Sequence, residues 1–401
     1  MGAAPLSHKQ ADGFRRAFAG SRYQVVRRAE PHEVFWYRLG ALLVGLLLAL
    51  AIVPFFATAS VGTVYQRIWQ STVTTSTGFQ NTLHEAIPLM FTGLAVAIPY
   101  RMRLWNIGAE GQLFVGGFAA AGVAFSLPHM NGGLLKLLMV AAAAGAGAAW
   151  IFVPALMRVY IGANEIVSTL LLNFVGYYVL VYWVSERWNS ASVSAGSLTS
   201  GFIPTQSWGP TLNISSVAVP WSLALVIVLA LVASFVFKRT IVGYEIGILG
   251  AAPSAGRFAG MPVRRRMMTV MLVGGACAGL AGAASLMDTG HAYGDNISNN
   301  YGYSGIAVAL LAAGSPLGAI LMAWIFSLIT ISGDALRVSG VSSDFAFALI
   351  GMILFLAAIA DSLTRYQLSR VYRGAETGVD VGAGSAGAHS PPPEAEVAEP
   401  K

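Results

Sequence analysis

The chain has 401 residues, of which 56% are hydrophobic and only 10% are charged, with a net charge of +6. Soluble domains carry roughly 25% charged residues, so a chain this apolar lacks the polar surface of a water-soluble enzyme. The mean hydropathy of +0.65 agrees with this exclusion and indicates an integral membrane protein.

The hydrophobic residues gather in long runs. Several approach or exceed the ~20 apolar residues that a helix needs to cross a bilayer, and the alternating pattern of outer-membrane strands is absent. Because backbone polar groups in lipid must be satisfied internally, these runs are expected to be helices. The sequence predicts an all-α, polytopic transmembrane bundle with about ten hydrophobic segments, near residues 38–58, 83–99, 105–127, 134–157, 164–184, 219–237, 267–287, 306–313, 317–331 and 345–360.

The distribution of positive charge predicts the orientation of these segments. If the N-terminus is cytoplasmic and the segments alternate, all the Lys and Arg residues except Arg67, Lys136, Arg187 and Arg337 fall on the cytoplasmic side. Such asymmetry is the positive-inside rule. It places both termini in the cytoplasm, and it makes nucleic acid an improbable partner because the charge serves topology.

Three regions follow from the composition. Residues 1–37 are a basic cytoplasmic segment without the apolar core of a cleavable signal peptide. Residues 38–365 form the transmembrane domain, which includes a basic cytoplasmic segment at 238–266. Residues 366–401 have few aromatic or β-branched residues and are predicted to be a disordered cytoplasmic tail. The single cysteine, Cys277, excludes an intramolecular disulfide and a cysteine metal cluster.

Polar residues open the third segment. Asn106, Glu110 and Gln112 stand among glycines in the stretch LWNIGAEGQL (104–113). A carboxylate at membrane depth indicates function by default, and glycines favour irregular backbone that lines a cavity. The alternative is a helix start in which Asn106 is the cap and Glu110 lies near the positive helix end. The chemistry alone does not separate the two interpretations.

A second polar group opens the fifth segment, in GANEIVST (162–169). Asn173 lies nine residues after Asn164 and therefore roughly on the same side of a helix. These amides could hydrogen-bond a solute, or they could join helices to one another, and the second interpretation is slightly favoured.

The cytoplasmic segment at 238–266 is too long for a turn and too apolar for a plain linker. Pro253 can begin a short helix, and Phe258 and Met261 would give that helix an apolar face open to the cytosol. Such a face suggests docking into a groove of another protein. A helix lying on the bilayer interface is the alternative.

The stretch YGYSGI (301–306) precedes the eighth segment, which is too short to cross and ends at Gly314-Ser315-Pro316. Short segments interrupted by glycine and proline are typical of transport sites built from half-helices, although a kinked structural helix has the same pattern. The chain contains no G-x-x-x-x-G-K-[ST], H-E-x-x-H or C-x-x-C motif. No catalytic or metal-binding residues are therefore predicted.

At these motifs the chain resembles the permease subunits of bacterial ABC importers for simple sugars and nucleosides, within the ribose/branched-chain amino acid permease family. The resemblance covers about residues 40–365 and is carried by NIGAEGQ (106–112), NEIVSTL (164–170) and GIAVALL (305–311). Residues 250–261 are similar to the family's cytoplasmic coupling segment. Ala252 and Gly256 depart from its usual pattern, in which Asn and Ala are common at these positions.

The resemblance implies the missing parts of a transporter. A separate ATPase, which would bind ATP and Mg²⁺, is expected to dock on the coupling segment at Pro253, Arg257, Phe258 and Gly260. A second, shorter permease and an extracytoplasmic substrate-binding protein would complete the assembly in the bacterial inner membrane. The chain itself is expected to be no enzyme and to carry no cofactor.

The sequence therefore predicts a permease subunit that moves a nucleoside or simple sugar by alternating access. Amides both donate and accept hydrogen bonds and so suit neutral polyhydroxy solutes. The residues expected to line or shape the path are Asn106, Glu110, Gln112, Asn164 and Asn173. A stand-alone secondary carrier or channel is the alternative, although an ion-coupled carrier or proton pump would need carboxylates deeper in the bundle. A membrane enzyme is disfavoured because no nucleophile–base pair is evident.

Overall fold

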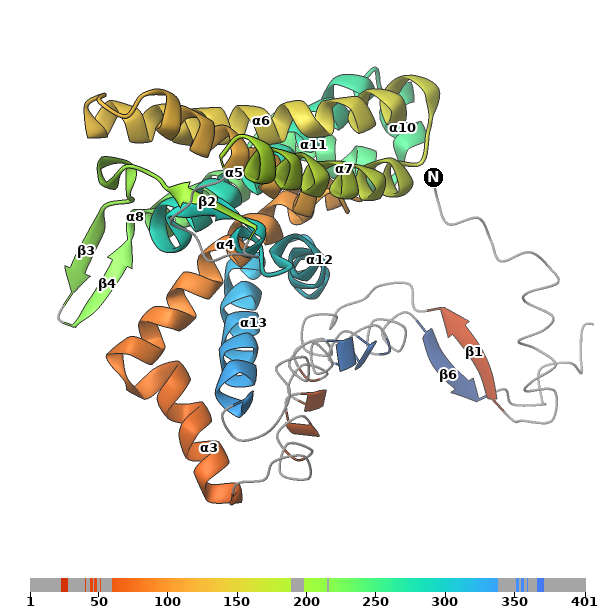
Figure 1. Cartoon of the computed structure of the whole chain (residues 1–401). Helices are drawn as coiled ribbons and strands as arrows, with labels where there is room; N and C mark the ends of the chain where they lie inside the picture. The colour runs from red at the N-terminus through yellow and green to blue at the C-terminus, as the bar shows by residue number, and fades with distance from the viewer. Residues whose placement is uncertain are drawn as a thin grey trace, which may run out of the picture. The chain divides into compact units, whose positions relative to one another are not determined.

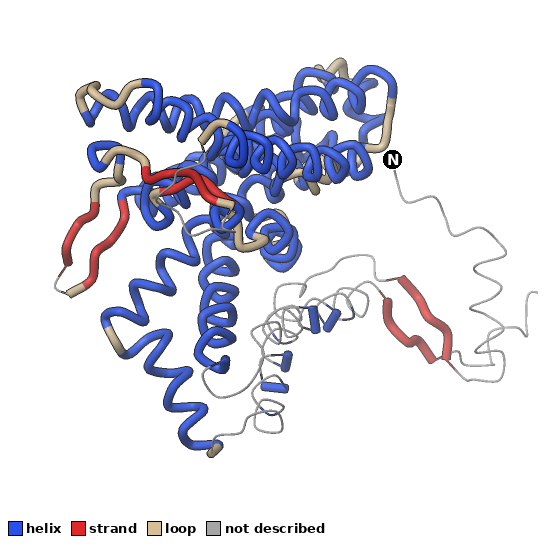
Figure 2. The backbone as a smooth tube through the Cα atoms, viewed as in Figure 1, coloured by secondary structure: helices blue, strands red, loops and turns tan. Residues whose placement is uncertain are grey.

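The chain is predominantly helical in the computed structural model (Figures 1 and 2). The structure describes residues 60–188, 198–214 and 216–337, together with short pieces at 23–27, 40, 44–45, 47–48, 51, 351–352, 355–356, 359 and 366–370.

Six helices in the described residues are long and apolar enough to cross a membrane. They are α4 (Ser76–Tyr100), α6 (Gly132–Ile161), α7 (Glu165–Glu186), α8 (Trp221–Arg239), α11 (Val263–Ser285) with the π-helical turn η3 (Leu286–Gly290), and α13 (Pro316–Arg337). A further helix, α5 (Ala109–Ser126), occupies the third predicted segment and carries the polar residues Glu110 and Gln112 near its start. The predicted segments between 83 and 331 each coincide with a helix, whereas the first and tenth lie largely outside the described residues.

Helix α11 lies at the centre of the bundle and packs against α4, α5 and α6 (Figure 1). Small residues permit this approach, because membrane helices gain stability from close van der Waals packing. A Cβ on Gly275 of α11 would lie 2.6 Å from the Gly147 carbonyl oxygen of α6, and a Cβ on Gly147 would lie 2.8 Å from the Gly279 nitrogen. The glycine-rich composition thus sets the distance between the central helices.

The eighth segment forms the short helix α12 (Tyr301–Leu311). Its 11 residues extend for about 16 Å, roughly half of a bilayer core. Ala313 and Gly314, at φ 54° and 68°, turn the chain, and Pro316 begins α13. The prediction of a short, broken segment is confirmed, although the helix begins earlier than expected because Tyr301 and Gly302 belong to it.

The connections lie at two ends of the bundle. One end carries α9 (Ile241–Ala251) and α10 (Pro253–Phe258) and is called the α10 end. The opposite end, called the hairpin end, carries the antiparallel pair β3 (Thr211–Ile214) and β4 (Val217–Pro220), and the pair β2 (Thr199–Phe202) and β5 (Ala292–Gly294). The helix α3 (Val61–Trp69), the π-helical turn η1 (Gln70–Thr74) and the 3-10 turns η2 (Thr205–Ser207) and η4 (Asp295–Ile297) complete the described elements of this unit.

A second compact unit contains residues 6–29 and 365–401. In it β1 (Tyr23–Arg27) pairs antiparallel with β6 (Tyr366–Arg370). The first five residues of the predicted disordered tail therefore form a strand, and the remainder of that tail lies outside the described residues.

Helix packing around α11 yields a direct test. Gly147→Val should lower the melting temperature of the detergent-solubilised protein, because overpacking of this kind costs roughly 1–3 kcal/mol. Gly145→Val is the matched control, since no described atom lies within 4 Å of the Cβ that it would add. Equal melting temperatures for the two variants, measured by size-exclusion chromatography after heating, would contradict this packing.

Candidate functional site

The non-helical linker from Leu104 to Gly108 joins α4 to α5 and lies beside a cluster of buried polar side chains. Asn106 is completely buried and Gln112 is nearly so. Their side-chain amides bond reciprocally, with Asn106 Nδ2 donating to Gln112 Oε1 at 2.9 Å and Gln112 Nε2 donating to Asn106 Oδ1 at 2.8 Å. Asn106 also donates to the Ala95 carbonyl at 3.2 Å. The pair therefore fastens the linker to α4.

Asn173 reaches the same region from α7. Its Oδ1 accepts from the Gly111 N–H at 2.8 Å, and its Nδ2 donates to the Ile107 carbonyl at 2.8 Å. Nδ2 also lies 3.4 Å from the Tyr303 hydroxyl of α12. One side chain thus satisfies an acceptor of the linker and a donor in the first turn of α5, both of which would otherwise be unpaired inside the bundle.

Glu110 binds the start of α12. Its Oε1 accepts from the Ser298 hydroxyl at 2.6 Å, and its Oε2 accepts from the Gly302 N–H at 2.7 Å. The first N–H groups of a helix have no intrahelical partner and carry partial positive charge. Because Glu110 also lies in the first turn of α5, the carboxylate is stabilised by two helix N-termini.

Two residues of α4 hold the same half-helix. The Tyr301 hydroxyl donates to Glu85 Oε2 at 2.7 Å, and the Thr92 hydroxyl donates to the Tyr301 carbonyl at 2.9 Å. Glu85 and Thr92 are contributors that sequence reasoning missed. The membrane-depth carboxylate of Glu85 was the available signal, but its partner is more than 200 residues away in the chain.

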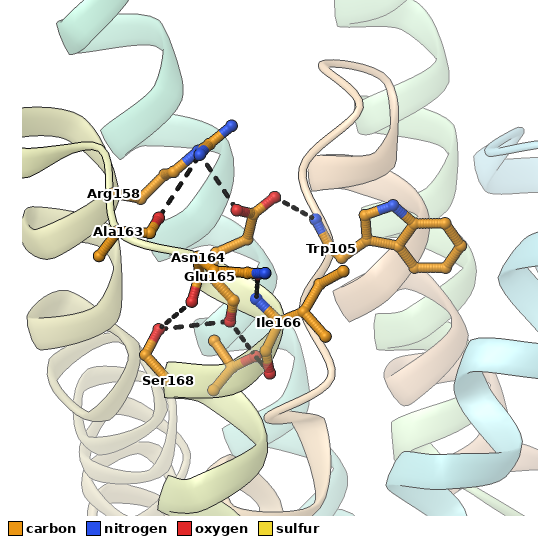
Figure 3. Close-up of polar contacts among 8 residues, drawn as sticks. Trp105, Arg158, Ala163, Asn164, Glu165, Ile166 and Ser168 are labelled. Atoms are coloured by element: carbon orange, nitrogen blue, oxygen red, sulfur yellow. Dashed lines mark hydrogen bonds and ion pairs between the residues drawn. The ribbon is translucent and has the colours of Figure 1, made fainter. Parts of the chain in front are cut away.

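Asn164 lies apart from this cluster, as an N-terminal cap of α7 that accepts from the Ile166 N–H at 3.0 Å (Figure 3). Its neighbour Glu165 is buried and has the more central position. Glu165 Oε2 lies 3.2 Å from Arg158 Nε, and Oε1 accepts from the Trp105 N–H at 3.4 Å. Glu165 therefore ties the linker to the turn between α6 and α7, a contact that the sequence interpretation did not anticipate.

The structure brings Asn106, Glu110, Gln112 and Asn173 together, and each is already hydrogen-bonded inside the chain. This arrangement is suited to holding an interrupted helix pair in one geometry. Among the described residues, no three His, Cys, Asp or Glu side chains are placed to hold a metal ion.

The predicted docking helix is present as α10. Pro253 is its first residue, Arg257 is exposed, Phe258 is 96% exposed, and Gly260 turns the chain at φ 72°. The expectation that Met261 also faces solvent is wrong, because Met261 is half-buried against the core.

Helix α9 provides exposed apolar side chains at the same end of the bundle, where Met261 does not. Its residues Ile241 and Tyr244 are exposed. Together with Phe258, these exposed apolar side chains of α9 and α10 are called the docking surface.

Helix α9 touches the backbone that follows α4, just before the linker. A Cβ on Gly250 of α9 would lie 3.2 Å from the Met102 Cα, so the two backbones touch. The Arg101 guanidinium lies over the Phe237 ring at 5.3 Å, and the Tyr100 and Trp105 rings are 5.2 Å apart. A displacement of α9 would therefore reach the linker through the few residues that precede it.

The six spanning helices and the buried cluster at a helix interruption define a multi-pass membrane protein. The family described as branched-chain amino acid transport system / permease component matches residues 78–358. The chain belongs to this family. It is a transport subunit rather than an enzyme, and ATP hydrolysis belongs to a separate subunit.

Three relatives illustrate the similarity. The guanosine ABC transporter permease protein NupP of Bacillus subtilis is 30% identical over 79% of this chain and 91% of its own length. The nucleoside ABC transporter permease protein NupB of Lactococcus lactis is 26% identical over 81% of this chain and 88% of its own. The glucose ABC transporter permease protein TsgB13 of Haloferax volcanii is 30% identical over 80% and 87%, respectively.

The amide pair can be tested by a double-mutant cycle. Asn106→Leu should destabilise the protein by about 1–3 kcal/mol, because it leaves the buried Gln112 amide unsatisfied. Adding Gln112→Met should recover part of this loss, since removal of both partners leaves no orphaned group. Thermal melting of the two single variants and the double variant gives the coupling, and strict additivity would contradict the reciprocal pair.

Proposed function

We propose that the chain is one permease of an ATP-driven importer that moves a nucleoside or a simple sugar by alternating access. The observation that carries this proposal is the exposed docking surface on α9 and α10, together with the backbone contact between Gly250 of α9 and Arg101 and Met102, which precede the linker. A motor protein bound to α9 would therefore act on the chain next to the interrupted helices. The printed activities of the relatives, which include guanosine, nucleosides and glucose, support the solute class.

The α10 end faces the cytoplasm in this proposal. The docking surface is flanked by Lys238, Arg239, Arg264, Arg265 and Arg266, and positive charge of this density favours the cytoplasmic side of a membrane protein. Both termini are then cytoplasmic, about ten segments enter the bilayer, and the membrane is the bacterial inner membrane.

A separate ATPase, which binds ATP and Mg²⁺, docks on α9 and α10. Phe258 is the natural anchor, because a large aromatic ring that is almost fully exposed gains most from burial in a partner's pocket. Arg257 is exposed beside it and can pair with an acidic rim. Pro253 and Gly260 set the beginning and the end of the docking helix.

An extracytoplasmic binding protein delivers solute at the hairpin end. Phe202 of β2 and Leu212 and Ile214 of β3 are exposed at this end. Exposed apolar side chains of this kind can become the buried core of an interface with the binding protein. A second permease, different from this chain and shorter, completes the passage.

The polar cluster shapes the path. Asn106, Gln112, Glu110 and Asn173 hold the linker and α12 in register, and Asn164 caps α7, so their contribution to transport is through geometry. Loss of the Glu110 side chain would release the first turn of α12 and would therefore change the width of the passage beside it.

Phe258→Ala should detach the ATPase. Anchor residues of interfaces contribute about 2 kcal/mol or more, so binding of the purified ATPase is expected to weaken by about 30-fold. Phe235→Ala on α8 is the matched control, because this ring is also exposed but lies in a membrane-spanning helix. If pull-down titrations showed that the ATPase binds the Phe258→Ala variant with unchanged affinity, the proposal that the ATPase docks on this surface would be contradicted.

The proposed function is tested by reconstitution of the complete complex in vesicles. We expect uptake of labelled guanosine or glucose that requires ATP, the ATPase and the binding protein together. Accumulation of either solute against its gradient by vesicles that contain this chain alone would identify a secondary carrier and overturn the proposal.

A further inference from the structure

One exposed helix face differs in chemistry from its neighbours. The exposed large side chains between Phe152 and Leu156 of α6 and along α8 are hydrocarbon, as lipid requires: Phe152, Val153, Leu156, Ile227, Val228, Leu231, Val232 and Phe235. Such residues are favourable at the centre of a bilayer. These faces therefore suit contact with acyl chains.

Helix α7 carries a stripe of exposed rings instead. Phe174, Tyr178 and Tyr182 are 56%, 66% and 54% exposed, and their spacing of four residues places them on one side of the helix. Tyr303 of α12 is partly exposed, and its hydroxyl lies 3.4 Å from Asn173 of α7. These four residues are called the aromatic face. Figure 1 shows α7 in front of α5, and both α7 and α12 pack against α5.

The aromatic face extends further from the end of α7 than an aromatic belt at the membrane–water interface would. Tyrosine is enriched at the membrane–water interface, where its hydroxyl is hydrated. Tyr182 and Trp183 belong to the last turn or so of α7 before its end at Glu186, where a spanning helix is expected to reach the interface. Tyr178 lies about 12 Å from that end, given 1.5 Å per residue. The residue at comparable depth on α8 is Val228, which is 53% exposed.

An exposed phenol at this depth is poorly suited to hydrocarbon, because its hydroxyl needs a hydrogen-bond partner. A water-filled passage supplies that partner. We propose that the aromatic face lines the solute path and that it binds a solute with a planar heteroaromatic ring, as in a nucleoside, by stacking on Phe174 and Tyr178. This proposal rests on the proposed function and names the part of the solute that the path recognises.

The chemistry of the face favours a nucleoside over a free sugar. Ring stacking tolerates any base because every base has a π-face, which suits a passage that must bind weakly and release. The hydroxyls of Tyr178, Tyr182 and Tyr303 add donors and acceptors along the edge of the stripe. Beyond Phe174, the same stripe continues as the aliphatic Leu171 and Val167, so the hydroxyl-bearing half is the half nearer the hairpin end.

Cysteine accessibility tests the position of the face. The chain has one cysteine, which is buried and can be replaced in the background as Cys277→Ala. In the assembled complex, Tyr178→Cys and Phe174→Cys should react with a charged, water-soluble thiosulfonate, and guanosine delivered by the binding protein should slow the reaction. Val228→Cys and Val232→Cys are the matched controls on α8 and should stay unreactive. Unreactive thiols in the Phe174→Cys and Tyr178→Cys variants of a complex that still transports would overturn the proposal and leave the proposed function intact.

Uptake kinetics test the recognition of the ring. Tyr178→Leu should raise the KM for guanosine about tenfold, since stacking on one ring is lost. Tyr178→Phe keeps the ring, and its KM for guanosine should stay within about twofold of that of the unmodified complex. An unchanged KM for Tyr178→Leu, or equal protection of the Tyr178→Cys thiol by ribose and by guanosine, would overturn the assignment of a planar ring.

Discussion

The non-helical backbone from Leu104 to Gly108 is the constraint on which the rest of the structure depends. Inside a membrane bundle an irregular stretch is tolerated only where protein groups pair its N–H and C=O groups. Here Asn173 pairs with Ile107 and Gly111, and Glu165 pairs with Trp105. The polar side chains that look most like a solute site are therefore engaged by the chain's own backbone.

This use of polar residues links three elements that are distant in sequence. Asn173 binds α7 to α5 and lies beside Tyr303, and Glu110 binds α5 to the first turn of α12. The result is a unit of α5, α7 and α12 whose members should move together. Gly250 of α9 touches Arg101 and Met102, which precede the same linker. In the proposed function, a movement of α9 would therefore reach the unit that carries the aromatic face.

Much of the fold was predictable because run length and charge asymmetry are properties of the sequence alone. The short α12 followed from Gly314 and Pro316. The pairing of β2 with β5 was not predictable, since it joins Thr199 and Phe202 to residues of a distant segment, and both segments have the composition of polar loops. Periodicity in the sequence likewise did not predict the strand β6, because its partner β1 is remote in the chain.

The site was predictable in composition but not in role. Asn106 and Gln112 carry the same amide whether they bind a solute or each other, and only their 2.8 and 2.9 Å hydrogen bonds decide between the two. Met261 was misassigned because α10 ends at Phe258, so Met261 lies beyond the helix whose face it was expected to share. The rings of α7 were passed over because an apolar run has the same pattern whether it faces lipid, protein or water.

We infer that the polar cluster holds α5, α7 and α12 together and that its hydrogen bonds stay intact throughout the transport cycle. Cryo-electron microscopy of the complete complex with and without a bound ATP analogue tests it most directly. The account predicts that the Glu110–Gly302 and Asn173–Gly111 hydrogen bonds persist in both states while α5, α7 and α12 shift as one body. Release of either contact in one of the two states, with solute in its place, would contradict it.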